Sequence, residues 1–239
     1  MSHAPRPIRI NPLPILARTT LLLLATAFVC QLIRFLFGIP TAKRLVPLFD
    51  INREANIPTF FSSLLLTIAA LLLWLISRAE AEKKASWTLL SVGILLMAID
   101  EIVRFHEDLT NPARWILSGN ATGILYHTWV IFGLGVSVLM LLSFWRFLVE
   151  LPATTRIRFT WAGLIYLSGA IVLESINGLI FEKTDDSPIY NLSSAIEEAL
   201  EIAVVLLLIR ALIRHLAEQH PEVRLVFGPP ATSRNDSVD

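Results

Sequence analysis

The sequence predicts an all-α membrane protein, a bundle of six transmembrane helices with both termini in the cytoplasm. Hydrophobic residues make up 54% of the 239 residues and charged residues only 17%. Mean hydropathy is +0.63. Soluble domains carry about 25% charged residues. The deficit lies in apolar runs long enough to cross a hydrocarbon core about 30 Å thick, which indicates an integral membrane protein with the lipid bilayer as its main partner.

Charge and cysteine content exclude several other classes. The formal net charge is zero, so nothing indicates a nucleic-acid partner. The chain has one cysteine, Cys30, which lies inside an apolar run. A single cysteine excludes a disulfide framework and a cysteine-based metal site within one chain, and we interpret Cys30 as a packing residue.

Six segments offer about 20 predominantly apolar residues each. They are residues 15–38, 59–77, 86–107, 123–147, 159–181 and 192–215. The first follows a basic stretch, as a secretory signal would. Its apolar run is longer than that of a signal and no small-x-small cleavage motif ends it, so we expect it to remain as a helix. Residues 1–14 and 216–239 are expected to be cytoplasmic tails, the second of them disordered.

Glycine, proline and asparagine mark the predicted breaks. Gly38-Ile39-Pro40 ends the first helix, and Pro58 suits the first turn of the second. Thr110-Asn111-Pro112 and Ser118-Gly119-Asn120 separate the third helix from the fourth, and Asp185-Asp186-Ser187-Pro188 precedes the sixth. Tryptophans near the predicted ends suggest an aromatic belt: Trp87, Trp115, Trp129, Trp145 and Trp161.

Lysine and arginine are more numerous on the side of the predicted bundle that holds both termini. The positive-inside rule therefore places both termini in the cytoplasm, which agrees with an even number of spans. In this topology the stretch AIDEIVRFHE, residues 98–107, lies at the outer end of the third helix.

Acidic and imidazole side chains of the last four helices fall at a similar depth, in the outer half of the predicted bundle. We interpret eight of them as a candidate metal site: Asp100, Glu101, His106, Glu107, His127, Glu174, Glu197 and Glu201. An ionised carboxylate near the bilayer centre costs about 2.5–3.5 kcal/mol on insertion scales. Water access, protonation or a bound cation must therefore compensate the group.

Several of these residues also have local explanations. Ser194-Ala195-Ile196-Glu197 fits a capping box, which would make Glu197 a helix cap. Asp100 and Arg104 are spaced for an i,i+4 ion pair. His127 fits a hydrogen-bonded packing residue. Glu174 is the hardest to explain locally, because its apolar run contains no cation.

Three functions remain open. Carboxylates and imidazoles on facing helices suit iron, zinc or manganese, and such a site could serve a hydrolase or an oxidoreductase acting on a small molecule or a lipid. Intramembrane carboxylates also serve proton- or cation-coupled transporters, although the polar groups do not continue into the inner half. The third hypothesis is that the chain is a structural or sensory membrane protein.

Two segments resemble a group of uncharacterised bacterial multi-pass membrane proteins. They are EANIPTFFSS, residues 54–63, and the DE-x4-HE motif of Asp100–Glu107, and the resemblance covers roughly residues 49–201. It implies a bacterial inner-membrane location and no particular activity. The chain resembles, more distantly, membrane hydrolases that hold zinc between helices, from which it is expected to differ by having no late pair of zinc-binding histidines.

Overall fold

The computed structural model describes residues 11–39, 44–53, 55–117 and 121–221, and every regular element in these ranges is helical. The long helices are α1 (Leu13–Phe37), α3 (Ile57–Ala79), α4 (Lys84–Val103), α7 (Val130–Glu150), α8 (Ala153–Leu167), η3 (Ser168–Leu173, a π-helical segment), α9 (Glu174–Thr184) and α10 (Pro188–Gln219). The short ones are α2 (Leu45–Phe49), α5 (Phe105–Asp108), α6 (Thr110–Ile116) and the 3-10 turn η2 (Gly123–Leu125). The all-α prediction is confirmed for this part of the chain.

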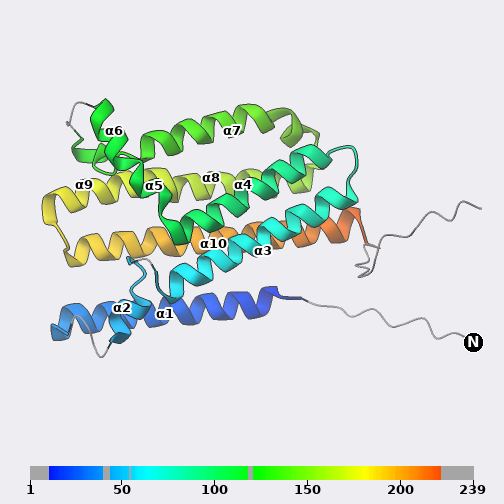
Figure 1. The fold of residues 1–239 in the computed structure, drawn as a ribbon. Coiled ribbons are helices and arrows are strands. Elements are labelled where there is room, and N and C mark those ends of the chain that lie inside the picture. Colours follow the sequence, from blue (N-terminus) through cyan, green and yellow to red (C-terminus); the bar gives the residue numbers. More distant parts are fainter. Residues whose placement is uncertain (1–10, 40–43, 54, 118–120, 222–239) are drawn as a thin grey trace, which may run out of the picture.

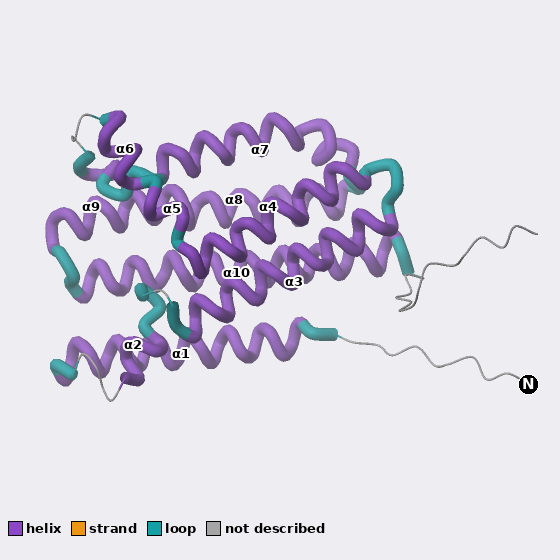
Figure 2. Tube along the Cα trace, in the orientation of Figure 1, coloured by secondary structure: helices purple, strands orange, loops and turns teal. Residues whose placement is uncertain are grey.

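The long helices run back and forth along one axis (Figure 1). Because α8, η3 and α9 continue without a break, they form one helix over Ala153–Thr184. The start of α1 and the end of α10 lie toward the same end of the bundle, which we call the terminal end (Figure 1). The short helices α2, α5 and α6 lie toward the opposite, far end (Figure 2).

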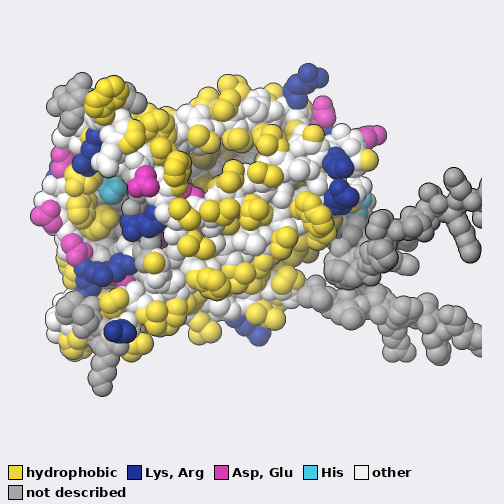
Figure 3. Space-filling view, in the orientation of Figure 1, with side chains coloured by type: hydrophobic (Ala, Val, Ile, Leu, Met, Phe, Trp, Pro, Cys, Tyr) yellow, Lys and Arg dark blue, Asp and Glu magenta, His cyan; other side chains and the backbone are white. Residues whose placement is uncertain are grey.

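Five of the described helices are long and apolar enough to cross a membrane: α1, α3, α4, α7 and the continuous helix over Ala153–Thr184. Hydrophobic side chains cover the middle of the face in Figure 3, while charged side chains gather mainly toward its two ends. These features indicate a multi-pass membrane protein. α10 is long enough but is not one of these five, and its charged residues include Glu197, Glu198, Glu201, Arg210 and Arg214.

The core forms where α3 packs against α4 and α10. Leu65, Ala69, Leu73 and Ile76 recur at the three- and four-residue spacing of one helix face, and all four are buried. The opposite face of α3 leaves large apolar side chains such as Trp74 exposed, as a lipid-facing surface requires. α3 therefore has one protein-facing and one lipid-facing side.

Local capping explains where two helices begin. The Asn56 side chain accepts a hydrogen bond from the Thr59 N–H at 3.1 Å, so α3 begins at Ile57, before the predicted residue 59, with Pro58 in its first turn as expected. At α10, the Ser187 hydroxyl accepts from the Tyr190 N–H at 3.2 Å, and Pro188 occupies the first turn. α10 thus begins before the predicted residue 192.

Three other predicted boundaries are also wrong. The fifth span begins at Ala153 rather than at 159. α4 ends at Val103 rather than at 107, because Arg104 adopts a left-handed conformation with φ of 63°. α7 begins at Val130 rather than at 123, so His127 lies in the preceding turn. The prediction of an aromatic belt is correct only in part. Trp87 is fully buried, whereas Trp115, Trp145 and Trp161 are exposed.

Candidate functional site

Glu174 lies at the centre of a polar cluster in the far-end half of the bundle. Its Oε1 lies 3.2 Å from His127 Nδ1 and accepts a hydrogen bond from Trp129 Nε1 at 3.0 Å. The Glu197 carboxyl of α10 lies beside that of Glu174 and accepts a hydrogen bond from the buried Asn177 amide of α9. The turn before α7, the start of α9 and the first half of α10 therefore meet here.

Two further carboxylates extend this cluster across the bundle. Glu201 packs against the backbone of Gly169 in η3, where an added Cβ would lie 3.3 Å from Glu201 Cγ. Glu201 is also close enough to Glu101 on α4 to interact electrostatically with it. The Glu101 side chain also lies near Ser62 of α3. We call Glu101, His127, Glu174, Glu197 and Glu201 the far-end cluster.

Asp100 and His106 form a neighbouring pair. Asp100 Oδ2 lies 2.6 Å from His106 Nδ1, and Asp100 Oδ1 accepts from the His106 backbone N–H at 3.0 Å. The His106 ring contacts the Trp129 ring edge-on, with centroids 4.9 Å apart. Trp129 thus lies between this pair and Glu174. Glu107 belongs to α5, but its side chain lies outside the described residues.

The structure changes two local explanations of these residues. Glu197 is not a helix cap, because α10 begins at Pro188 and is capped by Ser187. The helical i,i+4 spacing assumed for Asp100 and Arg104 does not apply, because α4 ends at Val103 and Arg104 has a left-handed conformation. Asp100 instead fixes the turn that leads from α4 into α5.

A second group of metal-ligand residues lies at the terminal end. Glu80 follows α3, His215 lies in α10 and His220 ends it. Glu80 Oε1 lies 2.7 Å from His215 Nε2 and 3.2 Å from His220 Nε2. Among the residues that the structure describes, these three form the only group whose ligand atoms all lie within 4.8 Å of one another. We call them the terminal-end triad.

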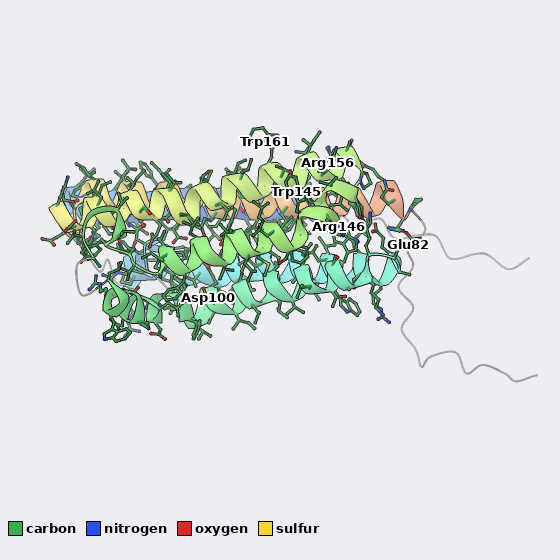
Figure 4. The ribbon with its side chains drawn as sticks, turned by 90° about the horizontal axis from the view of Figure 1, so that it is seen from above. Glu82, Asp100, Trp145, Arg146, Arg156 and Trp161 are labelled. Atoms are coloured by element: carbon green, nitrogen blue, oxygen red, sulfur yellow. The ribbon has the colours of Figure 1, made fainter. Side chains whose placement is uncertain are left out.

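The carboxylate of this triad is held in its charged form. Burial raises the pKa of Glu80, but hydrogen bonds from Trp87, His215 and His220 lower it by more, so the pKa lies below its usual value. Trp87 Nε1 donates to Glu80 Oε2 at 2.7 Å. In Figure 4, Glu82, Arg146 and Arg156 lie toward this same end, and Asp100 lies farther toward the far end.

The terminal-end triad is not among the residues predicted from the sequence. Two late histidines, His215 and His220, lie close to Glu80, although no late pair of zinc-binding histidines was expected. All three residues fall on the side of the predicted topology opposite to the denser carboxylates, so the depth of the acidic residues did not indicate them.

A family model described as a domain of unknown function, DUF8692, matches residues 16–216. The chain belongs to the DUF8692 family. The match covers the far-end cluster, Glu80 and His215, but it ends before His220. It agrees with the expected resemblance to an uncharacterised family. No curated protein and no solved structure matches the chain.

Gly178 of this DUF8692 chain allows His127 to approach α9, which gives a test of the far-end packing. A Cβ on residue 178 would lie 2.7 Å from His127 Cδ2 and 3.1 Å from Tyr126 Cβ. We expect Gly178→Ala to displace the His127 turn and to destabilise the protein by about 1–3 kcal/mol. The measurement is thermal unfolding in detergent, followed by circular dichroism.

Gly163→Ala is the matched control, because a Cβ there meets nothing within 4 Å. Alanine in an open helical position should be neutral or stabilising by about 0.5–1 kcal/mol. Equal unfolding temperatures for the two variants would show that the contact between α9 and the His127 turn does not constrain the fold.

Proposed function

We propose that the protein is a six-span inner-membrane protein of bacteria that binds a divalent cation, iron, zinc or manganese, in the far-end cluster. In this proposal α10 is the sixth span, both termini are cytoplasmic and the far end faces outward. The supporting observation is the contact of Glu174 with Glu197 and His127 between three segments of an otherwise apolar bundle.

The argument for a cation is electrostatic. Two adjacent carboxylates in a low-dielectric interior repel each other, so both are ionised only if a positive charge lies close to them. Glu101 and Glu201 add further acidic groups to the same half. His127 Nε2 and Asn177 Oδ1 are buried without a hydrogen-bond partner among the described protein groups, which leaves ligand atoms available.

Carboxylate oxygens and imidazole nitrogens together suit first-row divalent metals. Asp100 at the end of α4 and His106 and Glu107 in α5 are close to Glu101 in the sequence and are proposed as outer ligands or as an entry path. A metal held there would polarise a substrate or activate water, which is the basis of the catalytic form of this proposal.

Proton- or cation-coupled transport is supported less well. After Glu201, α10 continues as eight apolar residues, Ile202–Ile209, before Arg210. A conducting path requires polar groups or water through both halves of the membrane. The polar residues of α10 therefore favour a site that opens to one side only.

The test is metal content by mass spectrometry of protein purified in detergent and equilibrated with Fe²⁺, Zn²⁺ or Mn²⁺. We expect Glu174→Gln to lose a stoichiometric amount of metal that the wild type holds. Glutamine keeps the shape of the side chain and an acceptor for Trp129, so the fold should persist. Glu150→Gln, at an exposed carboxylate of the terminal end, is the control and should bind as the wild type does.

Equal metal content in the wild type and Glu174→Gln would contradict the proposal. Metal-independent cation flux in proteoliposomes that disappears in Glu174→Gln would instead support the transport hypothesis. Glu80→Gln is included so that metal held at the terminal end is not attributed to the far-end cluster, since that variant should keep the far-end metal.

A further inference from the structure

The terminal-end triad has the donor set of an open metal site. Glu80 supplies a carboxylate oxygen, and His215 and His220 supply imidazole nitrogens, from two helices that are far apart in sequence. Two histidines and one carboxylate are the protein ligands of many catalytic zinc sites and of non-haem iron sites. Such sites keep at least one coordination position for water or substrate.

The distances fit a small movement onto a shared ion. Two ligands of a tetrahedral ion at about 2.05 Å from the metal lie about 3.3 Å apart. Glu80 Oε1 is 2.7 Å from His215 Nε2 and 3.2 Å from His220 Nε2. The two imidazole nitrogens lie within 4.8 Å of each other. Side-chain movements of up to about 1.5 Å would therefore bring the three ligand atoms to the separations required around one ion.

Partners outside the triad fix the orientation of its members. His215 is fully buried, and its Nδ1 lies 3.0 Å from the Thr155 hydroxyl of α8, which directs Nε2 toward Glu80. The other Glu80 oxygen, Oε2, accepts the hydrogen bond of Trp87. Metal-binding histidines and carboxylates are commonly held by outer hydrogen bonds of this kind, which set the ring tautomer and orientation.

The triad is accessible from one side. An open cavity of about 530 Å³ lies at the terminal end, and its lining includes Glu80, Lys83, Glu150 and His220. His220 is 24% exposed and Glu80 18% exposed, whereas His215 behind them is 1% exposed. An ion would therefore enter through the cavity and keep a coordination position facing it.

We propose that Glu80, His215 and His220 bind a divalent transition metal of the zinc and iron(II) class, with an open position toward the terminal-end cavity. This site is separate from the far-end cluster and does not depend on the function proposed for that cluster. A hydrogen-bonded clamp that only joins α3 to α10 is the competing interpretation, and it predicts no stoichiometric metal.

The experiment measures Zn²⁺ binding to the full chain in detergent by competition with a chelating dye, and Co²⁺ binding by visible absorption. We expect stoichiometric binding in the wild type and a loss of affinity of about 100-fold or more in His220→Ala and Glu80→Gln. Thr155→Val should weaken binding by about 10–100-fold and change the Co²⁺ spectrum, because it releases the His215 ring.

Glu82→Gln is the matched control, because Glu82 lines the same cavity without belonging to the triad. Glu82→Gln and Glu174→Gln should bind at the terminal end as the wild type does. Binding that is absent in the wild type, or unchanged in both His220→Ala and Glu80→Gln, overturns the proposal. Thermal unfolding of each variant shows whether it is folded, and Glu80→Gln, which keeps the side-chain shape, covers the case in which His220→Ala does not fold.

Discussion

Trp87→Ala is expected to destabilise the protein by about 3–5 kcal/mol, because it removes the largest fully buried side chain. The Trp87 ring contacts Phe147 of α7 edge-on at 4.8 Å between centroids and Phe159 of α8 at 5.9 Å. It also lies against His215 at 5.2 Å. Alanine would leave a cavity where α4, α7, α8 and α10 meet.

The polar part of this effect can be separated from the packing part. Trp87→Phe keeps most of the ring but removes the donor to Glu80 Oε2, and we expect a cost of about 1–3 kcal/mol. Trp161→Ala is the control, since Trp161 is 61% exposed on α8, and its effect should stay within about 0.5 kcal/mol. Reversible unfolding in mixed detergent measures all three. A similar loss in Trp87→Ala and Trp161→Ala would contradict the buried position of Trp87.

The sequence predicted the helices well because the physical signal is local. An apolar run of membrane-spanning length indicates a helix wherever it occurs, and Asn56-Ile57-Pro58-Thr59 also contains the cap that begins α3. The helix boundaries that were predicted wrongly depend on hydrogen bonds from side chains to the backbone of irregular turns. The α4 end required Asp100 to bind the His106 backbone, and the α10 start required Ser187 rather than Ser194 as the cap.

That the residues of the far-end cluster lie in one half of the bundle was also predictable, because a helix rises by 1.5 Å per residue. Position along the helix axis alone does not determine which side chains touch. The contact between Glu174 and His127 depends on the absence of a side chain at Gly178 and on the turn before α7. In the terminal-end triad, His215 and His220 follow Glu80 by 135 and 140 positions in the sequence. Only the packing of α3 on α10 determines how close these side chains lie in space.

The position of α1 depends on a buried ion pair at the far end. Asp50 is 1% exposed, and Arg34 of α1 approaches its Oδ2 at 3.3 Å through Nη1. The same guanidinium donates to Asn191 Oδ1 at 3.2 Å and pairs with Asp186, both near the start of α10. Arg34 therefore links α1 to the segment after α2 and to α10, the helix that supplies Glu197 and Glu201 of the far-end cluster.

We expect Arg34→Met to destabilise the protein by about 3–5 kcal/mol, because it leaves the Asp50 carboxylate buried without its main cation. Arg53→Met is the matched control. Arg53 also contacts Asp50 Oδ2 at 3.3 Å, but it is 58% exposed, and its loss should cost less than about 1 kcal/mol. The measurement is unfolding in mixed detergent, with cross-linking of α1 to α10 as a reporter of local detachment.

Removing both charges distinguishes the energetic contribution of the Arg34–Asp50 ion pair from that of the surrounding packing. In Arg34→Met/Asp50→Leu no buried charge remains, so we expect most of the stability lost in Arg34→Met to return. Gln31 Nε2, which donates to Asp50 Oδ1 at 2.7 Å, would then lose its acceptor, and recovery should be incomplete for that reason. If Arg34→Met and Arg53→Met behave alike, the attachment of α1 must come from apolar packing against α10 instead.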